Sequence, residues 1–259
     1  GVCVSGINGC EASNHPGVMW AIWRREWNGF LNSLVAYIAM VVFLLITGLF
    51  IWVFPDYSIL EFGYAQLDQL FVIGPWVLMF LVPAVTMRFF SEEKRSGTAE
   101  LLFTRPVSTS GVVLGKFLAG WALVLFSVLP TLCYVVALYY LAEPVGNLDL
   151  GGIAGSYLGL VLLGGVFAGI GTWASAVTEH PVVSFVLGVF LCFFMYAAFD
   201  SLRFLPLPNT ALLVIEQLGI GAHFESMSKG VVDLRDLVYF ASVTFFFLFW
   251  TRTVLDQRT

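Results

Sequence analysis

Six long blocks without Asp, Glu, Lys or Arg dominate this sequence. They cover residues 27–55, 69–87, 117–142, 150–178, 180–199 and 237–251, which are 29, 19, 26, 29, 20 and 15 residues long. A helix needs about 20 apolar residues to cross the hydrocarbon core of a membrane, whereas a barrel strand needs only about ten of alternating polarity. Five blocks therefore predict membrane-spanning helices outright. The sixth reaches that length if Arg252 extends its charged end to the interface.

The composition excludes several other classes of protein. Hydrophobic residues make up 59% of the 259 residues and charged residues 11%, whereas a soluble domain carries about 25% charged residues. Disorder requires low hydrophobicity, and a net charge of −5 without a basic run longer than two residues argues against nucleic-acid binding. We predict an all-α integral membrane protein with six transmembrane helices, at about residues 34–54, 70–90, 112–141, 153–177, 181–199 and 235–255.

Residues 1–18 differ from the rest of the chain. They lack the basic start and the apolar core of a signal peptide, and Met19 stands where a natural start would be expected. We interpret residues 1–18 as a leader or an added extension that is disordered. We expect residues 19–259 to form a single transmembrane domain.

An amphipathic segment precedes the first predicted span. Its aromatic residues recur at steps of three and four, while Arg24, Arg25 and Glu26 fall largely between them. This pattern predicts an interfacial helix over residues 19–33, with its tryptophans at headgroup depth. Two roles are open: a simple anchor that sets orientation, or an anchor that also touches a cytoplasmic partner.

Lysine and arginine near the span ends predict the orientation. With six spans both chain ends lie on one side, and that side receives nine Lys and Arg residues against three on the other. We therefore expect a multi-pass membrane protein with both termini in the cytoplasm.

The fourth predicted span is rich in glycine. Gly151, Gly155 and Gly159 are spaced by four, and Gly165 and Gly169 repeat the interval. Small residues at this spacing let helix backbones approach closely. Packing within the chain is the expected use, and contact between subunits is the other.

Catalytic and metal-binding motifs are not found in this sequence. The string from Gly111 to Lys116 is too short for a phosphate-binding loop and lacks the hydroxyl that holds magnesium. The three histidines are too scattered for a zinc site, and the cores of the predicted spans hold none of the charged residues that an ion-coupled transporter usually carries. We expect no catalytic residue, no metal site and no cofactor in this chain, and an energy source outside it.

The predicted second loop, residues 88–108, is the most distinctive segment. It opens with a dense cluster of mixed charges, Gly97 permits a turn, and Thr98 can cap a short helix with Glu100 in its first turn. Leu101 and Leu102 then form an apolar ridge that ends before a proline. A helix of this kind suits docking into a groove of a cytoplasmic protein, although a solvated turn that enforces orientation is equally compatible with the pattern.

The order of residues in this loop resembles the ABC-2 type transporter permeases. The shared pattern is Phe-x-Glu-Glu, a basic residue, Gly-Thr-x-Glu-Leu-Leu, then Pro-x-Ser, followed by Gly115-Lys116 at the opening of the next span. The segment 223–240 is similar to the gliding-motility-associated and nitrous-oxide-maturation branch. The resemblance covers about residues 20–258.

The resemblance implies a permease subunit of an ATP-binding-cassette transporter in the bacterial cytoplasmic (inner) membrane. The chain would couple ATP hydrolysis by a separate cytoplasmic ABC ATPase, which binds the ATP and Mg²⁺, to export or mechanotransmission. A second permease subunit would complete a homodimer or heterodimer in the lipid bilayer. The loop would carry the coupling helix, with contacts to the ATPase from Glu92, Glu93, Arg95, Gly97, Thr98, Glu100, Leu101 and Leu102. The segment with Trp23, Arg24, Arg25 and Trp27 would be the connecting helix.

Two other functions remain open on the sequence. A cargo-free membrane scaffold of a motility or secretion machine could use the same coupling loop. An ion-coupled secondary transporter is disfavoured by the missing charges within the spans and by the lack of a second, repeated half.

Overall fold

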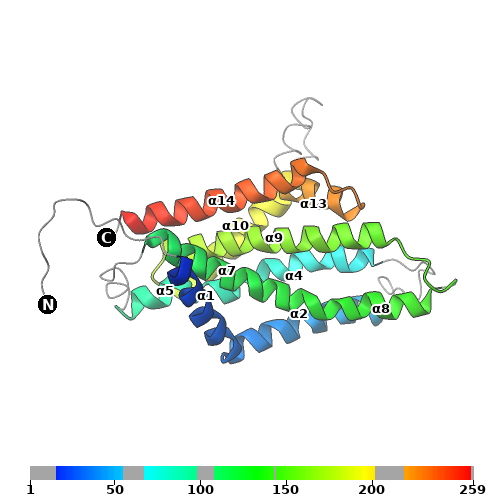
Figure 1. Cartoon of the computed structure of the whole chain (residues 1–259), viewed down its shortest axis with the longest axis horizontal. Coiled ribbons are helices and arrows are strands. Elements are labelled where there is room, and N and C mark those ends of the chain that lie inside the picture. The colour runs from blue at the N-terminus through cyan, green and yellow to red at the C-terminus, as the bar shows by residue number, and fades with distance from the viewer. Residues whose placement is uncertain (1–15, 55–66, 98–107, 143, 202–218, 258–259) are drawn as a thin grey trace, which may run out of the picture.

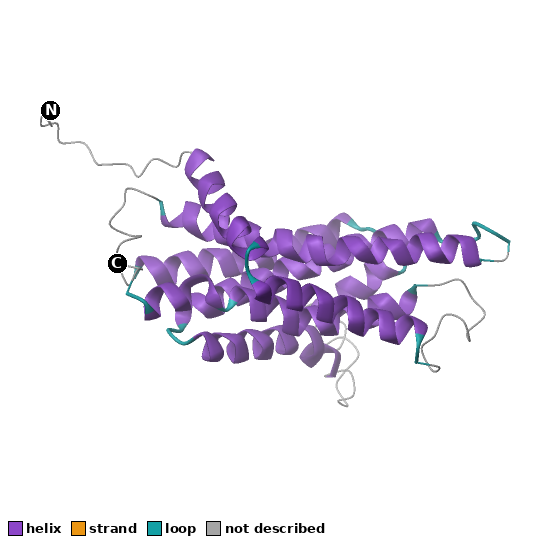
Figure 2. Cartoon of the chain, turned by 90° about the horizontal axis from the view of Figure 1, so that it is seen from below, coloured by secondary structure: helices purple, strands orange, loops and turns teal. Residues whose placement is uncertain are grey.

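Helices form all the regular structure of the described residues. The computed structural model describes residues 16–54, 67–97, 108–142, 144–201 and 219–257. Figures 1 and 2 show most of these helices running along one long axis as a bundle. The elements are α1 Pro16–Leu31, α2 Leu34–Trp52, α4 Asp68–Thr86, α5 Arg88–Arg95, α7 Thr109–Val128, the 3₁₀ turn η2 Leu129–Thr131, α8 Leu132–Leu141, α9 Leu150–Val177, α10 Pro181–Phe193, the π-helical turn η3 Phe194–Ala198, α11 Phe199–Ser201, α13 Ile220–Ser228 and α14 Leu234–Asp256.

Five helical stretches are long and apolar enough to cross a membrane. They are Asp68–Arg95, Thr109–Leu141, Leu150–Val177, Pro181–Ala198 and Leu234–Asp256. The segments Trp20–Leu31 and Ala36–Trp52 meet at an angle of 66°, and together they make a sixth candidate if they are counted as one span. The structure thus has a helix at every predicted span, while the number of membrane crossings is five to six.

Three predicted spans are less regular than the uncharged blocks suggested. The span expected at 112–141 is interrupted by η2, where Pro130 provides no backbone N–H for a helical bond. The span expected at 181–199 ends in the π-helical turn η3. The span expected at 70–90 is followed by α5, which keeps the chain helical through the charged residues up to Arg95, because Phe89 and Phe90 on that helix are buried.

Helix α9 is the centre of the bundle and contacts α4, α5, α7, α10, α13 and α14. Its middle is fully buried, as at Leu163, Phe167 and Ile170. Its glycines allow this crowding: a Cβ at Gly155 would lie 2.6 Å from the carbonyl oxygen of Met227 on α13. Glycine in α9 therefore serves packing within the chain at this position, as expected.

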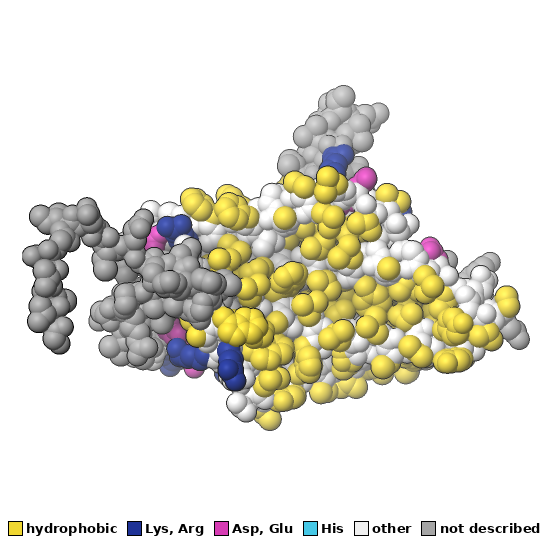
Figure 3. Space-filling view, in the orientation of Figure 1, with side chains coloured by type: hydrophobic (Ala, Val, Ile, Leu, Met, Phe, Trp, Pro, Cys, Tyr) yellow, Lys and Arg dark blue, Asp and Glu magenta, His cyan; other side chains and the backbone are white. Residues whose placement is uncertain are grey.

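Apolar side chains cover the flank of the bundle, and charged side chains lie toward its two ends. Figure 3 shows this distribution, with Lys and Arg concentrated at the end that holds α1 and α5. The exposed apolar residues include Val41, Phe80, Phe190 and Phe245. A belt of this kind is what a protein surrounded by lipid requires, and it leaves the two ends as the places where polar partners can bind.

Candidate functional site

A buried lysine joins three helices at the end of the bundle that holds α1 and α5. The ammonium Nζ of Lys116, on α7, lies 2.7 Å from Oε1 of Glu93 on α5 and 3.6 Å from Oε1 of Glu26 on α1. It also donates to the backbone carbonyl of Phe89 and lies 4.8 Å from the centre of the Phe90 ring. We call these five residues the Lys116 cluster.

Local helix geometry explains why these side chains converge. Lys116 is 2% exposed and stands one turn after Val112 and one turn before Gly120, so it lies on the buried face of α7. A lysine on such a face must find a counter-charge, because an unpaired buried ammonium is very costly. Glu26 lies one turn before Phe30, which packs on Phe89. The apolar contact between α1 and α5 therefore brings the carboxylate to the lysine.

The start of α5 is fixed to α9 by one hydroxyl. Met87, which precedes α5, has no side chain able to cap the helix. Ser175 on α9 instead accepts hydrogen bonds from the backbone N–H groups of Phe90 and Ser91, at 2.8 and 3.1 Å, and donates to the carbonyl of Met87 at 3.0 Å. Ser175 is fully buried. The central helix therefore supplies the polar partner that the start of α5 lacks in its own sequence.

Replacing Ser175 with alanine is expected to lower the free energy of unfolding by about 1–3 kcal/mol, because it removes a buried acceptor from two N–H groups and a donor from one carbonyl. Ser201→Ala is the control, since Ser201 is exposed and its hydroxyl donates to the carbonyl of Ala197, one helical turn earlier, at 2.9 Å. Its effect is expected to stay within about 0.5 kcal/mol. Denaturant unfolding of the detergent-solubilised variants measures both, and equal midpoints for the two would contradict the bonding role of Ser175.

A second side chain of α5 reaches the end of α9. The ammonium of Lys94 donates to the backbone carbonyl of Ala176, in the last turn of α9. A cation at this position satisfies a terminal carbonyl and interacts favourably with the helix dipole. Helix α5 is thus attached to α9 at its beginning and near its end.

A hollow of about 230 Å³ lies between α1 and α5 beside the Lys116 cluster. Its lining carries three acidic and three basic side chains, from Arg25, Glu26, Arg88, Glu92, Glu93 and Lys116. The charges of the described lining residues therefore balance. The hollow offers polar groups of both signs at the end of the bundle.

The structure describes half of the residues assigned to the coupling loop. Glu92 and Arg95 are exposed on α5, Glu93 is half-buried in the Lys116 cluster, and Gly97 has a φ of 70°, which suits the expected turn. The remaining four, Thr98, Glu100, Leu101 and Leu102, lie outside the described residues, and so does the short helix expected there.

The residues assigned to the connecting helix lie on α1. Arg24 and Arg25 are exposed, and Trp23 and Trp27 are half-buried with ring centres 6.1 Å apart. Trp27 also packs edge-on against Phe126 of α7, at 6.0 Å. Helix α1 is therefore held against α7 as well as joined to α2, while its position at a membrane interface stays a prediction.

Comparison with protein families assigns the chain. Residues 60–216, more than half of the sequence, match the family model described as ABC-2 family transporter protein. The chain belongs to the ABC-2 transporter family. A comparison with curated proteins gave no match. The gliding-motility and nitrous-oxide-maturation branch within the ABC-2 family therefore stays a prediction.

In this ABC-2 protein the structure joins residues that sequence reasoning did not connect. The sequence places Glu26 in an amphipathic pattern and Lys116 in the motif shared with the ABC-2 permeases, and nothing in it singles out Ser175. At the opposite end His223 and Asp236 form a buried pair, with Nδ1 and Oδ1 2.6 Å apart. One sequence pattern does indicate such contacts. A charged residue on the apolar face of a helix needs a buried partner elsewhere in the chain.

Proposed function

We propose that this ABC-2 family protein is the permease subunit of an ATP-binding-cassette transporter, driven by a separate cytoplasmic ATPase. An ABC-2 permease domain is a membrane component and not itself the ATPase. In this proposal the end of the bundle with α1 and α5 faces the cytoplasm, as the excess of basic residues predicts. ATP-driven movement of the partner acts there and leads to export or mechanotransmission.

The observation that carries the proposal is the attachment of α5 to the rest of the bundle. The Lys116 cluster connects α5 to α1 and α7, and Ser175 connects it to α9. A force applied to the segment that follows α5 would reach three other helices through short polar contacts. Movement between packed helices needs such discrete, stiff connections, because side chains in a close-packed interior do not deform continuously.

A groove on the ATPase is proposed to receive the ridge of Leu101 and Leu102. Those residues lie outside the described part of the chain, shortly after Gly97, which is exposed and follows the end of α5. Glu92 and Arg95, both exposed on α5, would flank the contact with charges. The proposal includes a second permease subunit, because two such bundles around a shared path are needed for alternating access.

The double replacement Leu101→Ala with Leu102→Ala is expected to abolish most copurification of the ATPase and most ATP-dependent turnover, while membrane insertion is unchanged. A matched control is Val231→Ala with Val232→Ala, which changes an exposed apolar pair at the opposite end of the bundle. The ATPase should copurify normally with this control variant. The measurement is recovery of the ATPase with the tagged permease, followed by ATPase assay in vesicles. Normal recovery and turnover in the Leu101/Leu102 variant would overturn the proposed coupling.

A further inference from the structure

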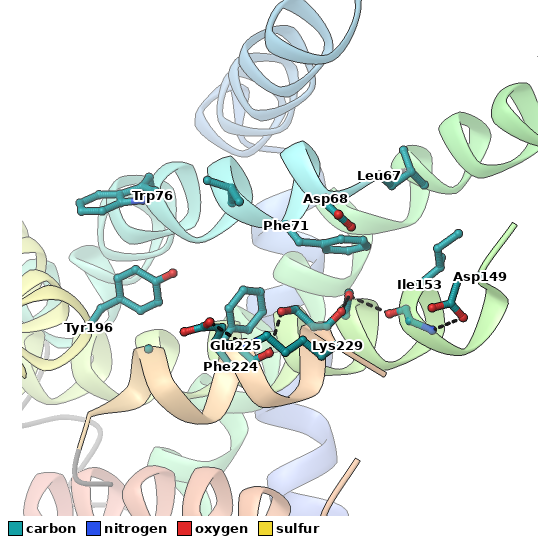
Figure 4. Close-up of a pocket in the computed structure, with 15 residues that line it drawn as sticks. Leu67, Asp68, Phe71, Trp76, Asp149, Ile153, Tyr196, Phe224, Glu225 and Lys229 are labelled. Atoms are coloured by element: carbon teal, nitrogen blue, oxygen red, sulfur yellow. Dashed lines mark hydrogen bonds and ion pairs between the residues drawn. The ribbon is translucent and has the colours of Figure 1, made fainter. Parts of the chain in front are cut away.

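A second site of quite different chemistry lies at the end of the bundle opposite the Lys116 cluster. A pocket of about 610 Å³ opens there between α4, α9 and α13. Figure 4 shows Asp68, Phe71 and Trp76 along one side, Phe224, Glu225 and Lys229 along the other, and open space between the two rows. Its volume falls within the range of small-molecule sites, about 300–1,000 Å³.

Aromatic rings form much of the pocket wall. Trp76 is 42% exposed although it lies within α4, and its ring is edge-on to Tyr196 with the centres 5.7 Å apart. Figure 4 places these two residues together at one end of the pocket. Ring faces presented to a cavity attract organic cations through their negative quadrupole, and they also bind apolar groups.

The charges in the lining fix the sign of the preferred ligand. Asp68, Asp149 and Glu225 are acidic, whereas Lys229 is the one basic side chain that the structure places in the lining. The ammonium of Lys229 lies 2.9 Å from Glu225, so it offsets one carboxylate and leaves an excess of two negative charges among the described lining residues. An anion would meet repulsion here, whereas a cation would be attracted.

An apolar groove continues from the same tryptophan. A hollow of about 660 Å³ lies between α2, α4 and α10, and the described residues that line it are all apolar. Trp76 lines both this groove and the pocket. The groove also contacts Val42, Phe80 and Ala84. A ligand whose charge lies among the carboxylates therefore has space for a bulky or extended apolar part beside Trp76.

The pocket wall formed by α13 is held firmly. His223 pairs with Asp236 of α14 at 2.6 Å, and its ring stacks on Tyr239 with the centres 3.9 Å apart. On the other side of α13 a Cβ at Gly159 of α9 would lie 3.2 Å from the Phe224 ring. The pocket is therefore formed before a ligand arrives, which reduces the entropic cost of binding.

We propose that this pocket binds an organic cation with an apolar body. As a statement about cargo it rests on the proposed permease function, whereas binding itself requires no ATPase. An ammonium on a free amphipathic molecule and the headgroup of an ethanolamine lipid share this chemistry. The pocket would hold the positive group among its carboxylates, beside Asp68 and Glu225, and the apolar body against Trp76.

The test uses tetraphenylphosphonium and tetraphenylborate, two ions of nearly the same size and shape with opposite charge. Equilibrium dialysis against the whole chain in dodecyl maltoside is expected to give saturable binding of the cation and none of the anion. Asp68→Asn and Glu225→Gln should each weaken cation binding about threefold to tenfold, and Trp76→Leu should weaken it to a similar extent. Lys229→Met should strengthen it about threefold or more, because it removes the opposing charge.

Asp256→Asn is the control, since it makes the same change of charge on an exposed side chain at the other end of the bundle, and it should leave affinity unchanged. Adding phosphatidylethanolamine distinguishes a lipid headgroup from a free amphipathic cation as the natural ligand. If the lipid competes with tetraphenylphosphonium, the ligand is the headgroup. If tetraphenylphosphonium binding is unaltered, the ligand is a free cation. Equal binding of the two ions, or weaker cation binding in Lys229→Met, would overturn the inference. If the cation does not bind but ATPase coupling is intact, the proposed permease function is unaffected. If ATPase coupling fails but the cation still binds, the binding site is unaffected.

Discussion

Lys116→Met is expected to lower the free energy of unfolding by about 3 kcal/mol, at the lower end of the range for breaking a buried ion pair. The substitution leaves Glu26 and Glu93 facing each other without the cation that lies between them. Both carboxylates keep some contact with solvent, with side chains 20% and 18% exposed, which limits the penalty. The midpoint of denaturant or thermal unfolding in detergent measures the effect.

An exposed ion pair provides the control for Lys116. Arg252 lies 3.3 Å from Asp256 on α14, and their side chains are 53% and 45% exposed. Arg252→Met is expected to change stability by less than about 1 kcal/mol, because solvent screens an exposed pair. If both methionine variants unfold at the midpoint of the original protein, the Lys116 cluster does not stabilise the bundle.

A triple variant separates the structural role of the cluster from its proposed role in transmission. Glu26→Gln, Glu93→Gln and Lys116→Met together remove all three charges, and most of the lost stability is expected to return because no buried charge is left unpaired. In the proposed mechanism this folded variant still binds the ATPase but shows reduced ATP-dependent turnover. Full turnover in the stable triple variant would show that the polar contacts are not needed for transmission.

Gly171→Ala is expected to lower the free energy of unfolding by about 1–3 kcal/mol, because it overpacks a close contact in the core. A Cβ at Gly171 of α9 would overlap Oγ1 of Thr86 on α4, and it would lie 3.1 Å from the Thr86 Cβ as well. Thr86 is fully buried and donates to the carbonyl of Val82 at 2.9 Å, so it has little room to move. Unfolding midpoints and yield of the monodisperse protein measure the result.

The matched control lies two residues away on the same helix. A Cβ at Gly169 would have its nearest neighbours at 3.7 Å, which is an ordinary van der Waals distance. Gly169→Ala should therefore be neutral or slightly stabilising, because alanine also favours the helix. Adding Thr86→Ala to Gly171→Ala should recover part of the loss. Equal effects of the two glycine variants would show that α4 and α9 are not packed as closely as the structure indicates.

Much of the helix content was predictable because lipid imposes a simple rule on sequence. Each uncharged block contains a helix, since every backbone polar group within a membrane must be bonded inside its own segment. The amphipathic α1 and the charged start of the second loop were also visible in the sequence. The predicted second span stopped short of Arg95 because charged residues were read as loop, whereas Phe89 and Phe90 keep that segment helical by packing.

The polar contacts were not predictable in the same way. Glu26, Glu93 and Lys116 are far apart in the chain, and no local period indicates which carboxylate meets which cation. Ser175 is one of many hydroxyl residues in apolar helices, and its importance comes from the position of α5 beside α9. The pocket between α4, α9 and α13 likewise depends on how separate helices pack, so its lining residues have no common signature in the sequence.

The 3₁₀ turn at Pro130 divides one long stretch of the chain into two parts with different attachments. On one side, α7 carries Lys116 and is joined to α1 and α5. On the other side, α8 places Tyr134 next to Trp52 of α2, with ring centres 6.4 Å apart. Proline has no backbone N–H, so bending at Pro130 costs no hydrogen bond that this residue would donate. The turn is therefore a point of bending, about which the half of this span that carries Lys116 can tilt while its far half stays against α2.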